Sequence, residues 1–329
     1  MVPEVSVVIV NFNAGRHLSR CLRQLAEQTF ANFEALVLDN ASSDGSFDQA
    51  AAALADPRFQ FIALGANPGF AAANNRGAKL ARGRWLACLN PDAFPHADWL
   101  EALLAAAGRH PEAGMFASLQ LDAKDPSLLD GAGDCYHAFG LAWRGGYGQP
   151  SACPLPEAPV FSACAAAALY DRARFLALGG FDERFFCFFE DVDLGFRWRL
   201  SGGSCVLVPA AVVEHLGSAS SSQISGFAHY HGTRNAVWCF VKNMPGPLVW
   251  LCLPGHVALM TLMLVSAWRH GQGRFIARAL IDAVGGLAET WRQRRAVQTR
   301  RAIGWAQVAR VLAWSPAWLA TRRPRLLAR

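Results

Sequence analysis

Short apolar runs alternate with segments of helical periodicity over the first hundred residues, and this alternation constrains the fold more than any other feature. An apolar run at 5–12 is followed by Leu18, Cys21, Leu22 and Leu25, which are spaced as on one face of a helix. The succession continues with strands expected at 33–38, 59–64 and 84–89, and helices at 46–55, within 67–82 and at 97–108. It predicts an α/β, Rossmann-like fold with a doubly wound, mostly parallel sheet.

Polar side chains follow three of these expected strands directly. Asn11 and Asn13 come after the first, Asp39 after the second, and the triplet from Asn90 to Asp92 after the fourth. Ligands of open α/β sheets bind beyond the carboxyl ends of the strands. We therefore expect a ligand site at this edge.

The middle of the chain is less regular. Residues 122–160 are rich in Gly, Pro and Asp with little periodicity, which predicts a long functional loop or excursion. Order returns with a helix expected at 171–178 and an acidic triplet, Glu190-Asp191-Val192-Asp193, before a helix that ends near Leu200. A strand at 205–208 follows, and His215 comes soon after it.

Charge divides the chain into two parts. Residues 1–247 carry 18 basic and 23 acidic side chains, whereas 248–329 carry 13 Arg and 2 acids, a net charge of 13 − 2 = +11. Residues 248–268 hold no formal charge and are long enough to cross a bilayer, but Pro254-Gly255-His256 favours a broken or interfacial helix. Segments 274–291 and 303–319 combine apolar faces with Trp and Arg, which is typical of interfacial helices. We expect residues 246–329 to form a helical tail that associates with an anionic membrane surface.

Several protein classes are disfavoured. The nine cysteines are odd in number and show no CxxC spacing, which argues for a reducing compartment and against a disulfide framework or a zinc site. No GxGxxG follows the first strand, so a dehydrogenase is excluded. The Trp and Leu content of the tail argues against a nucleic-acid partner. An apolar strand begins at Val5 with no basic stretch before it, so we expect the chain to act at the cytoplasmic face.

A series of short motifs occurs in a fixed order between about Val5 and Pro245. Together they resemble glycosyltransferase family 2 with its GT-A fold, and within it the rhamnosyltransferase-like branch of bacterial cell-surface polysaccharide synthesis. The resemblance implies a catalytic domain at 1–245 that transfers a sugar from a nucleotide donor with inversion. The motifs are Val10-Asn-Phe-Asn13, Leu38-Asp-Asn-Ala-Ser-Ser-Asp-Gly45, Asn67-Pro-Gly-Phe70 with Asn74 and Gly77, Asn90-Pro-Asp92, Gly180-Phe-Asp-Glu183, Glu190-Asp-Val-Asp193 and His215.

The resemblance implies a divalent cation, Mg²⁺ or Mn²⁺, held by Asp92 and His215. Such a cation neutralises the charge that develops on a departing nucleoside diphosphate. Asp92 occupies the second place of the family's DXD-type acidic pair, and Asn90 stands where the first acid is usual. The alternative for Asp92 is a turn or helix-cap role, and for His215 a structural one.

The acidic triplet matches the place of the family's catalytic base. The resemblance implies that Asp191 takes the proton from the attacking hydroxyl, with Glu190 and Asp193 orienting the acceptor or supporting the base. Crowded carboxylates raise one another's pKa, which suits a base. The alternative is an acidic first turn that complements the helix dipole.

The nucleotide pocket is expected from residues at several turns. Asp39 matches the family's nucleobase-contacting aspartate, and Asn11 and Asn13 are expected to line the same pocket. Turn chemistry is the alternative for Asn13, and an exposed helix surface is the alternative for Arg76. The full set of expected nucleotide contacts is Asn11, Asn13, Asp39, Asn67, Gly69, Asn74, Arg76 and Asn90.

The resemblance points to dTDP-L-rhamnose as donor, although UDP-hexose and UDP-galactofuranose enzymes share the scaffold. The tail indicates a lipid-linked saccharide acceptor at the cytoplasmic face of the inner membrane, with the protein peripheral or monotopic. A non-catalytic nucleotide-sugar-binding protein is the alternative, but the intact Glu190-Asp191 pair disfavours it. His229 and His231, beside Arg234-Asn235, are expected either to contact an acceptor phosphate or to begin a helix.

Overall fold

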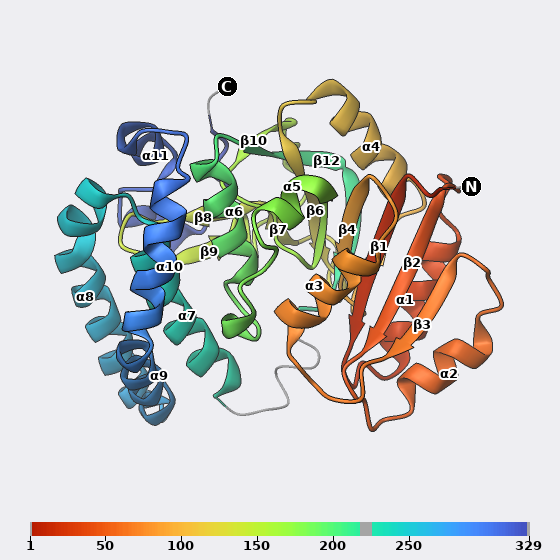
Figure 1. Ribbon diagram of the computed structural model, residues 1–329, viewed down its shortest axis with the longest axis horizontal. Helices are drawn as coiled ribbons and strands as arrows, with labels where there is room; N and C mark the ends of the chain where they lie inside the picture. Colours follow the sequence, from red (N-terminus) through yellow and green to blue (C-terminus); the bar gives the residue numbers. More distant parts are fainter. Residues whose placement is uncertain (1, 218–225, 328–329) are drawn as a thin grey trace.

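A mixed ten-stranded sheet forms the centre of the computed structural model, which describes residues 2–217 and 226–327 (Figure 1). Its strands run in the order β10-β12-β6-β11-β4-β1-β2-β3, with β5 paired to β12 and β7 to β6. The bounds are β1 (Val5–Asn11), β2 (Phe33–Asp39), β3 (Phe59–Ala63), β4 (Trp85–Leu89), β5 (Ala93–Pro95), β6 (Gly114–Asp122), β7 (Leu129–Ala132), β10 (Ala158–Val160), β11 (Ala167–Asp171) and β12 (Ser204–His215).

Strands β1 to β4 pair with one another in parallel, as the alternating pattern predicts. Strand β11 is antiparallel to both β4 and β6, and β12 returns parallel to β6. The predicted α/β, mostly parallel sheet is confirmed. The carboxyl ends of β1, β2 and β4 share one edge, because register pairs Asn11 with Asp39 and Ile9 with Leu89.

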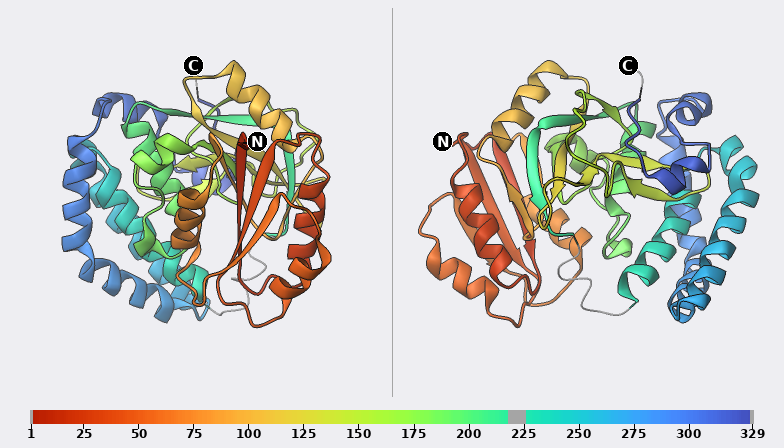
Figure 2. Two further views of the ribbon diagram at one scale, coloured as in Figure 1. Left: turned by 45° about the vertical axis from the view of Figure 1, so that its right-hand side comes forward. Right: turned by 180° about the vertical axis from the view of Figure 1, so that it is seen from behind.

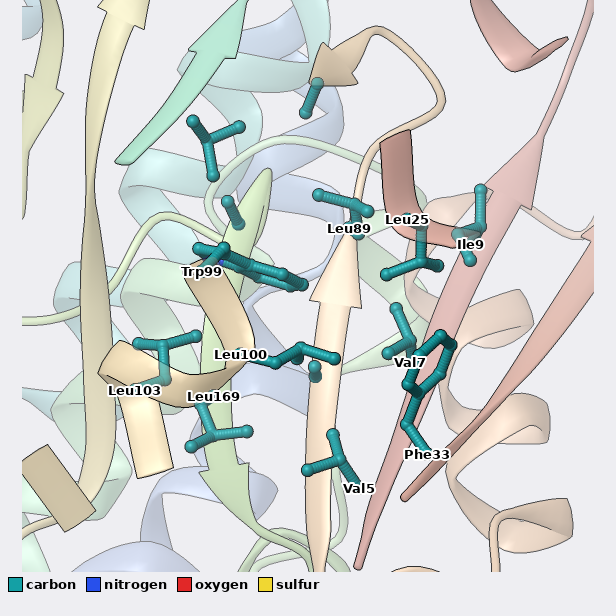
Figure 3. Close-up of a cluster of buried hydrophobic side chains, with 14 of the residues drawn as sticks. Val5, Val7, Ile9, Leu25, Phe33, Leu89, Trp99, Leu100, Leu103 and Leu169 are labelled. Carbon is teal, nitrogen blue, oxygen red and sulfur yellow. The ribbon is translucent and has the colours of Figure 1, made fainter. Parts of the chain in front are cut away.

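Helices cover both faces of the sheet. One face packs against α1 (Arg16–Ala26), α2 (Ser46–Ala53) and α4 (Trp99–Arg109), and Figure 3 shows Leu25, Leu100 and Leu103 meeting side chains of β1, β4 and β11. The other face packs against α3 (Phe70–Leu80), α5 (Arg172–Ala177) and α6 (Glu190–Leu200). The predicted apolar positions of α1 are all buried, which explains why this segment is helical.

The prediction of an irregular excursion at 122–160 is wrong. This segment contains β7, β10 and a separate two-stranded sheet of β8 (Asp134–Tyr136) and β9 (Ala142–Arg144). Strands of three or four residues are too short to show a period of two, so the Gly and Asp residues between them dominated the pattern.

Strand β12 is longer than the predicted 205–208 and reaches His215 across a register shift between Val208 and Val212. Its last residues pair antiparallel with β5, and His215 is the partner of Ala93. This pairing brings His215 beside Asp92.

The C-terminal helices gather at the end of the molecule opposite β3 (Figures 1 and 2). Helix α8 continues through Pro254, so the expected break is absent. Residues 274–291 and 303–319 each form two helices rather than one, divided near Gly286 and Pro316. The elements are α7 (Phe227–Asn243), α8 (Gly246–Arg269), α9 (Gly273–Gly285), α10 (Leu287–Thr299), α11 (Trp305–Val311) and α12 (Ala317–Thr321).

A shared core joins these helices to the rest of the chain. Tyr136, Phe161 and Phe196 form one buried cluster with Leu248 and Leu312. The Pro254-Gly255-His256 triplet belongs to this contact, since a Cβ on Gly255 would lie 2.4 Å from the Phe139 ring. Helices α8, α9 and α11 are therefore packed onto residues that precede Gly246 rather than suspended beside them.

Candidate active site

Two predicted nucleotide residues are in direct contact at the ends of β1 and β2. Asn11 Nδ2 lies 2.8 Å from Asp39 Oδ1, and the same amide reaches the hydroxyls of Ser42 and Ser46. Asp39 also accepts hydrogen bonds from the backbone N–H and hydroxyl of Ser42, which fixes its carboxylate. The buried Asn11 Oδ1 has no hydrogen-bond partner in the described part of the chain, so an acceptor remains here for a ligand.

Asn13 takes part in the same turn. It has a φ of 51°, and its Oδ1 accepts from the Ser43 N–H at 2.8 Å. Its own N–H donates to the Ser42 hydroxyl. These contacts are the turn chemistry that the sequence offered as the alternative to a ligand contact.

The loop before α3 is linked to this cluster. Asn67 Oδ1 accepts from Asn40 Nδ2 at 3.1 Å and from the Gly69 N–H at 3.0 Å. Gly69 has a φ of 92°, and a Cβ there would lie 2.7 Å from the Phe186 carbonyl oxygen, so only glycine fits. The nucleotide-side loop is therefore packed against the residues that precede the acidic triplet.

Two further predicted residues are not brought into the cluster by any contact. Asn74 is buried within α3, where its amide donates to the Phe70 carbonyl. Arg76 is exposed and lines a surface pocket of about 330 Å³ with Pro68, Lys79 and Glu183.

Asp92 and His215 lie together, as predicted. His215 Nε2 is 3.4 Å from Asp92 Oδ1, and both side chains are largely buried. On the other side of the ring, His215 Nδ1 is 2.8 Å from Asp130 Oδ2, which also contacts Arg144. Burial disfavours the charged imidazole, but the Asp130 and Asp92 carboxylates outweigh it and raise the pKa of His215 to about 9.

The donor atoms at this point fit a divalent cation. In residues 2–217 and 226–327 no group of three or more His, Cys, Asp or Glu side chains forms a metal cluster. The buried His215 Nε2 has no hydrogen-bond partner there, and it faces a carboxylate oxygen. Mg²⁺ and Mn²⁺ sites that act on phosphates often use one or two protein ligands, with phosphate oxygens and water completing the shell. Asp92 and His215 are such a pair.

Asp191 lies at the same edge of the sheet. Its Oδ2 accepts from the Ala165 N–H at 3.0 Å, and its Oδ1 from the Val192 N–H at 2.8 Å. The carbonyl oxygen of Ala166, the residue after Ala165, accepts from the Asn90 N–H at 2.8 Å. The predicted base and the Asn90-Pro91-Asp92 turn therefore flank one short segment before β11.

The carboxylates around Asp191 interact strongly. Burial raises the pKa of Asp191 against its backbone hydrogen bonds. Burial and the Asp191 charge raise the pKa values of Glu190 and Asp134 well above their ordinary range. Glu190 Oε2 is buried without a hydrogen-bond partner in the described residues. A carboxylate whose pKa is raised binds a proton more readily, which suits a general base.

Asp193 belongs to a different environment. Its carboxylate lies 2.7 Å from Lys242 Nζ and 2.8 Å from Arg197 Nε, and it accepts from Asn243 Nδ2. The side chain is fully buried and its partners come from α6 and α7. It is an ion-pair centre of the fold, not part of the cluster around Asp191.

Sequence reasoning missed several site residues. Asp130, Asp134 and Arg144 lie in the segment that was predicted to be irregular, where Gly131 and Gly133 next to two acids were the available signal. Asn235 was noticed only as a neighbour of His231. Its amide donates to the carbonyls of Phe185, Cys187 and Phe188, which immediately precede Glu190.

Solved structures with the same fold are glycosyltransferases of the GT-A class. A mannosyltransferase from Pyrobaculum calidifontis in complex with GDP-Man and Mn²⁺ superposes with a TM-score of 0.55 at 17% identity, covering 93% of this chain and 88% of that one. GalNAc-T7 with UDP, GalNAc and Mn²⁺ gives a TM-score of 0.59 at 17% identity over 73% of this chain, which spans about half (48%) of that structure. The GT-A fold is thereby shown.

Sequence comparison identifies the family of glycosyltransferases to which the chain belongs. The model of glycosyl transferase family 2 matches residues 6–129. An N-acetylglucosaminyl-diphospho-decaprenol L-rhamnosyltransferase of Mycobacterium tuberculosis is 32% identical in an alignment 306 positions long, which covers 83% of this chain and 97% of that protein. The chain belongs to glycosyl transferase family 2 and is a glycosyltransferase.

Proposed function

We propose that the chain is an inverting rhamnosyltransferase that moves L-rhamnose from dTDP-L-rhamnose to a saccharide on a lipid carrier. The observation that carries this proposal is the 32% identity to an L-rhamnosyltransferase of a lipid-linked N-acetylglucosamine over 97% of that protein's length. The cluster around Asp191 supports a catalytic role rather than binding alone, because it supplies a half-buried carboxylate with a raised pKa.

The transfer proceeds by direct displacement at the anomeric carbon. Asp191 accepts the proton of the acceptor hydroxyl as its oxygen forms the new bond, and the bond to the diphosphate oxygen breaks on the opposite side. No covalent enzyme intermediate is needed, so the anomeric configuration inverts. A divalent cation bound by Asp92 and His215 would supply positive charge to the departing diphosphate.

The nucleotide is proposed to lie along the edge formed by β1, β2 and the loop before α3. The Asn11 amide donates to the Asp39 carboxylate, which fixes both side chains and leaves the Asn11 Oδ1 acceptor for the base. On the other side of this edge, Gly69 has no Cβ, so its backbone lies close to Phe186. Asn13, Asn67, Asn74, Arg76 and Asn90 remain proposed contacts of the donor.

Membrane association is proposed through α8. Among the described residues α8 is the helix long and apolar enough to cross a bilayer, with a mean hydropathy of 2.0. One face packs into the shared core through Leu248 and Cys252, so the opposite face alone is available to lipid, and the helix would lie along the surface. That face exposes Trp250, Leu251, Val257, Leu262, Val265 and Trp268. Arginines of α9 beside it suit anionic headgroups at the cytoplasmic face.

A transfer assay with purified protein tests the proposal. The donors are dTDP-L-rhamnose, UDP-glucose, UDP-galactofuranose and GDP-mannose, and the acceptor is N-acetylglucosaminyl-diphospho-polyprenol in detergent micelles with Mn²⁺ or Mg²⁺. We expect rhamnose transfer with inverted anomeric configuration. Transfer from another donor alone would replace the sugar assignment, and donor binding without any transfer would favour the non-catalytic alternative.

A further inference from the structure

His215 is held between two carboxylates that contact opposite sides of its ring. Asp130 Oδ2 lies 2.8 Å from Nδ1, and Asp92 Oδ1 lies 3.4 Å from Nε2. The two carboxylates come from distant parts of the chain, Asp130 from β7 and Asp92 from the turn after β4. Both carboxylates and the imidazole are at least nine-tenths buried.

We infer that Asp130 is the positioning residue of the cation site: it fixes the ring and tautomer of His215 so that Nε2 faces the cation beside Asp92. The inference rests on the proposed function, in which Asp92 and His215 bind the cation. Histidine ligands of metals commonly donate their second ring N–H to a carboxylate, which sets the tautomer and makes the ligating nitrogen more basic. Asp130 occupies the place of that carboxylate.

Asp130 cannot itself share the cation with His215 Nε2 and Asp92. The two ring nitrogens of an imidazole point in divergent directions, and Asp130 contacts the nitrogen that points away from Asp92. The action of Asp130 on a bound cation is therefore exerted through His215.

Arg144 completes the arrangement. Its Nη1 contacts the same oxygen of Asp130 that accepts from His215, so the carboxylate is fixed in position beside the ring. Arg144 lies on β9 and Asp130 on β7, two neighbouring strands of the segment at 122–160. This segment thus has a function in the site: its Asp130 and Arg144 position His215 from the side of the ring that faces away from Asp92.

Direct measurement of Mn²⁺ binding tests the inference without relying on activity. The full chain in detergent is titrated with Mn²⁺ in the presence of dTDP, and free Mn²⁺ is followed by electron paramagnetic resonance. Removing such a supporting carboxylate costs about 10–100-fold in metal affinity. We expect a loss in this range for Asp130→Ala and a smaller loss for Asp130→Asn, whose amide oxygen still accepts from Nδ1–H. Asp125→Asn, which removes an exposed charge from the same segment, is the matched control and should bind normally.

A second readout separates positioning from simple destabilisation. The Mn²⁺ concentration that gives half-maximal transfer should rise in Asp130→Asn, and excess Mn²⁺ should restore most of kcat. Affinity equal to wild type in a folded Asp130→Asn or Asp130→Ala protein would overturn the inference. Rhamnose transfer by a wild-type protein that binds no Mn²⁺ would also overturn it while leaving the proposed function intact. A wild-type protein that binds Mn²⁺ with dTDP but transfers no sugar would instead contradict the proposed function.

Discussion

Asp193 and Lys242 form a buried ion pair in which the carboxylate Oδ1 and the ammonium nitrogen are 2.7 Å apart. Asp191, two residues earlier, is half-buried and accepts two backbone hydrogen bonds beside other acids. Within the acidic triplet, Asp193 therefore stabilises the fold, whereas Asp191 belongs to the candidate site. On a helix, residues two apart point in different directions, so one motif serves both.

The ion pair between Asp193 and Lys242 predicts that substitution of Asp193 lowers the stability of the protein without acting directly on the transfer reaction. Asp193→Asn leaves Arg197 without its buried counter-charge and leaves Lys242 paired with Asp182 alone, and breaking such a buried pair typically costs about 3–5 kcal/mol. Urea unfolding followed by circular dichroism should show a lower midpoint with an unchanged slope. Asp191→Asn is the matched control, because it removes the same charge two residues away, and a large loss of stability there would contradict this division of roles.

Asp191→Asn should abolish transfer and leave the donor bound. A positioned general base contributes about 10²–10⁴-fold to a rate, so kcat should fall by at least that factor. The affinity for dTDP, measured by calorimetry, should stay within a few-fold of wild type, since the hydrogen bonds of Asp191 go to the Ala165 and Val192 N–H groups and not to the proposed nucleotide residues. Near-normal turnover in this variant would rule out Asp191 as the base.

The crowded carboxylates predict opposite pH dependences for rate and stability. Because the pKa of Asp191 is raised, kcat should fall as the pH is lowered through that raised value, where the base becomes protonated. For stability the sign is reversed: folding raises the pKa of Glu190, so the native chain binds more protons than the unfolded one between the two values. Stability should therefore decline as the pH rises through this window.

Glu190→Gln tests the stability part of that prediction. The amide cannot ionise, so the decline should flatten, by about 1.4 kcal/mol for each tenfold change in proton affinity that folding imposes on Glu190. Thermal unfolding of both proteins at several pH values between about 5 and 9 measures it. Parallel curves for wild type and variant would mean that Glu190 does not carry the effect.

Asn235 should affect the rate of catalysis without contacting the donor or the acceptor. Phe186, Phe188 and Phe189 all have positive φ, a strained conformation for side chains of this size. The Asn235 amide donates to the carbonyls of Phe185, Cys187 and Phe188 and so holds this loop. Asn235→Ala should cost about 1–3 kcal/mol of stability because it leaves buried carbonyls unpaired, and should lower kcat more than it changes the donor KM. A change in KM alone would contradict this.

The sequence predicted those parts of the molecule whose patterns are long and regular. The strands and helices of residues 5–109 appear within about two residues at most ends, because most of them carry a face of buried side chains. Asp92 and His215 could be paired only through the family resemblance, since the β5–β12 contact that joins them spans more than a hundred residues. Asp130 was missed because β7 has four residues, too few to give a period, which leaves the neighbouring glycines as the available signal.

The C-terminal helices were the largest departure. Their amphipathic pattern was visible, but a pattern does not say whether the apolar face meets lipid or protein. In the structure α8 packs on protein on its inner side, where His256 Nδ1 lies 2.8 Å from the Phe139 carbonyl oxygen, and is open on its outer side, where Trp250 is 63% exposed. Deleting residues 248–329, the simplest test of a membrane tail, would therefore also remove part of the core and should yield unfolded protein.

Point substitutions on the outer face of α8 separate these two roles. Trp250→Glu with Leu262→Glu should lower binding to vesicles of anionic lipid by at least about tenfold, because two large apolar side chains no longer enter the interface. Leu80→Glu, which places the same charge at an exposed apolar position on α3, is the matched control and should bind as wild type. Vesicle flotation measures binding, and thermal unfolding should show both variants folded. If the double variant still floats with the vesicles while remaining folded, α8 is not the membrane contact.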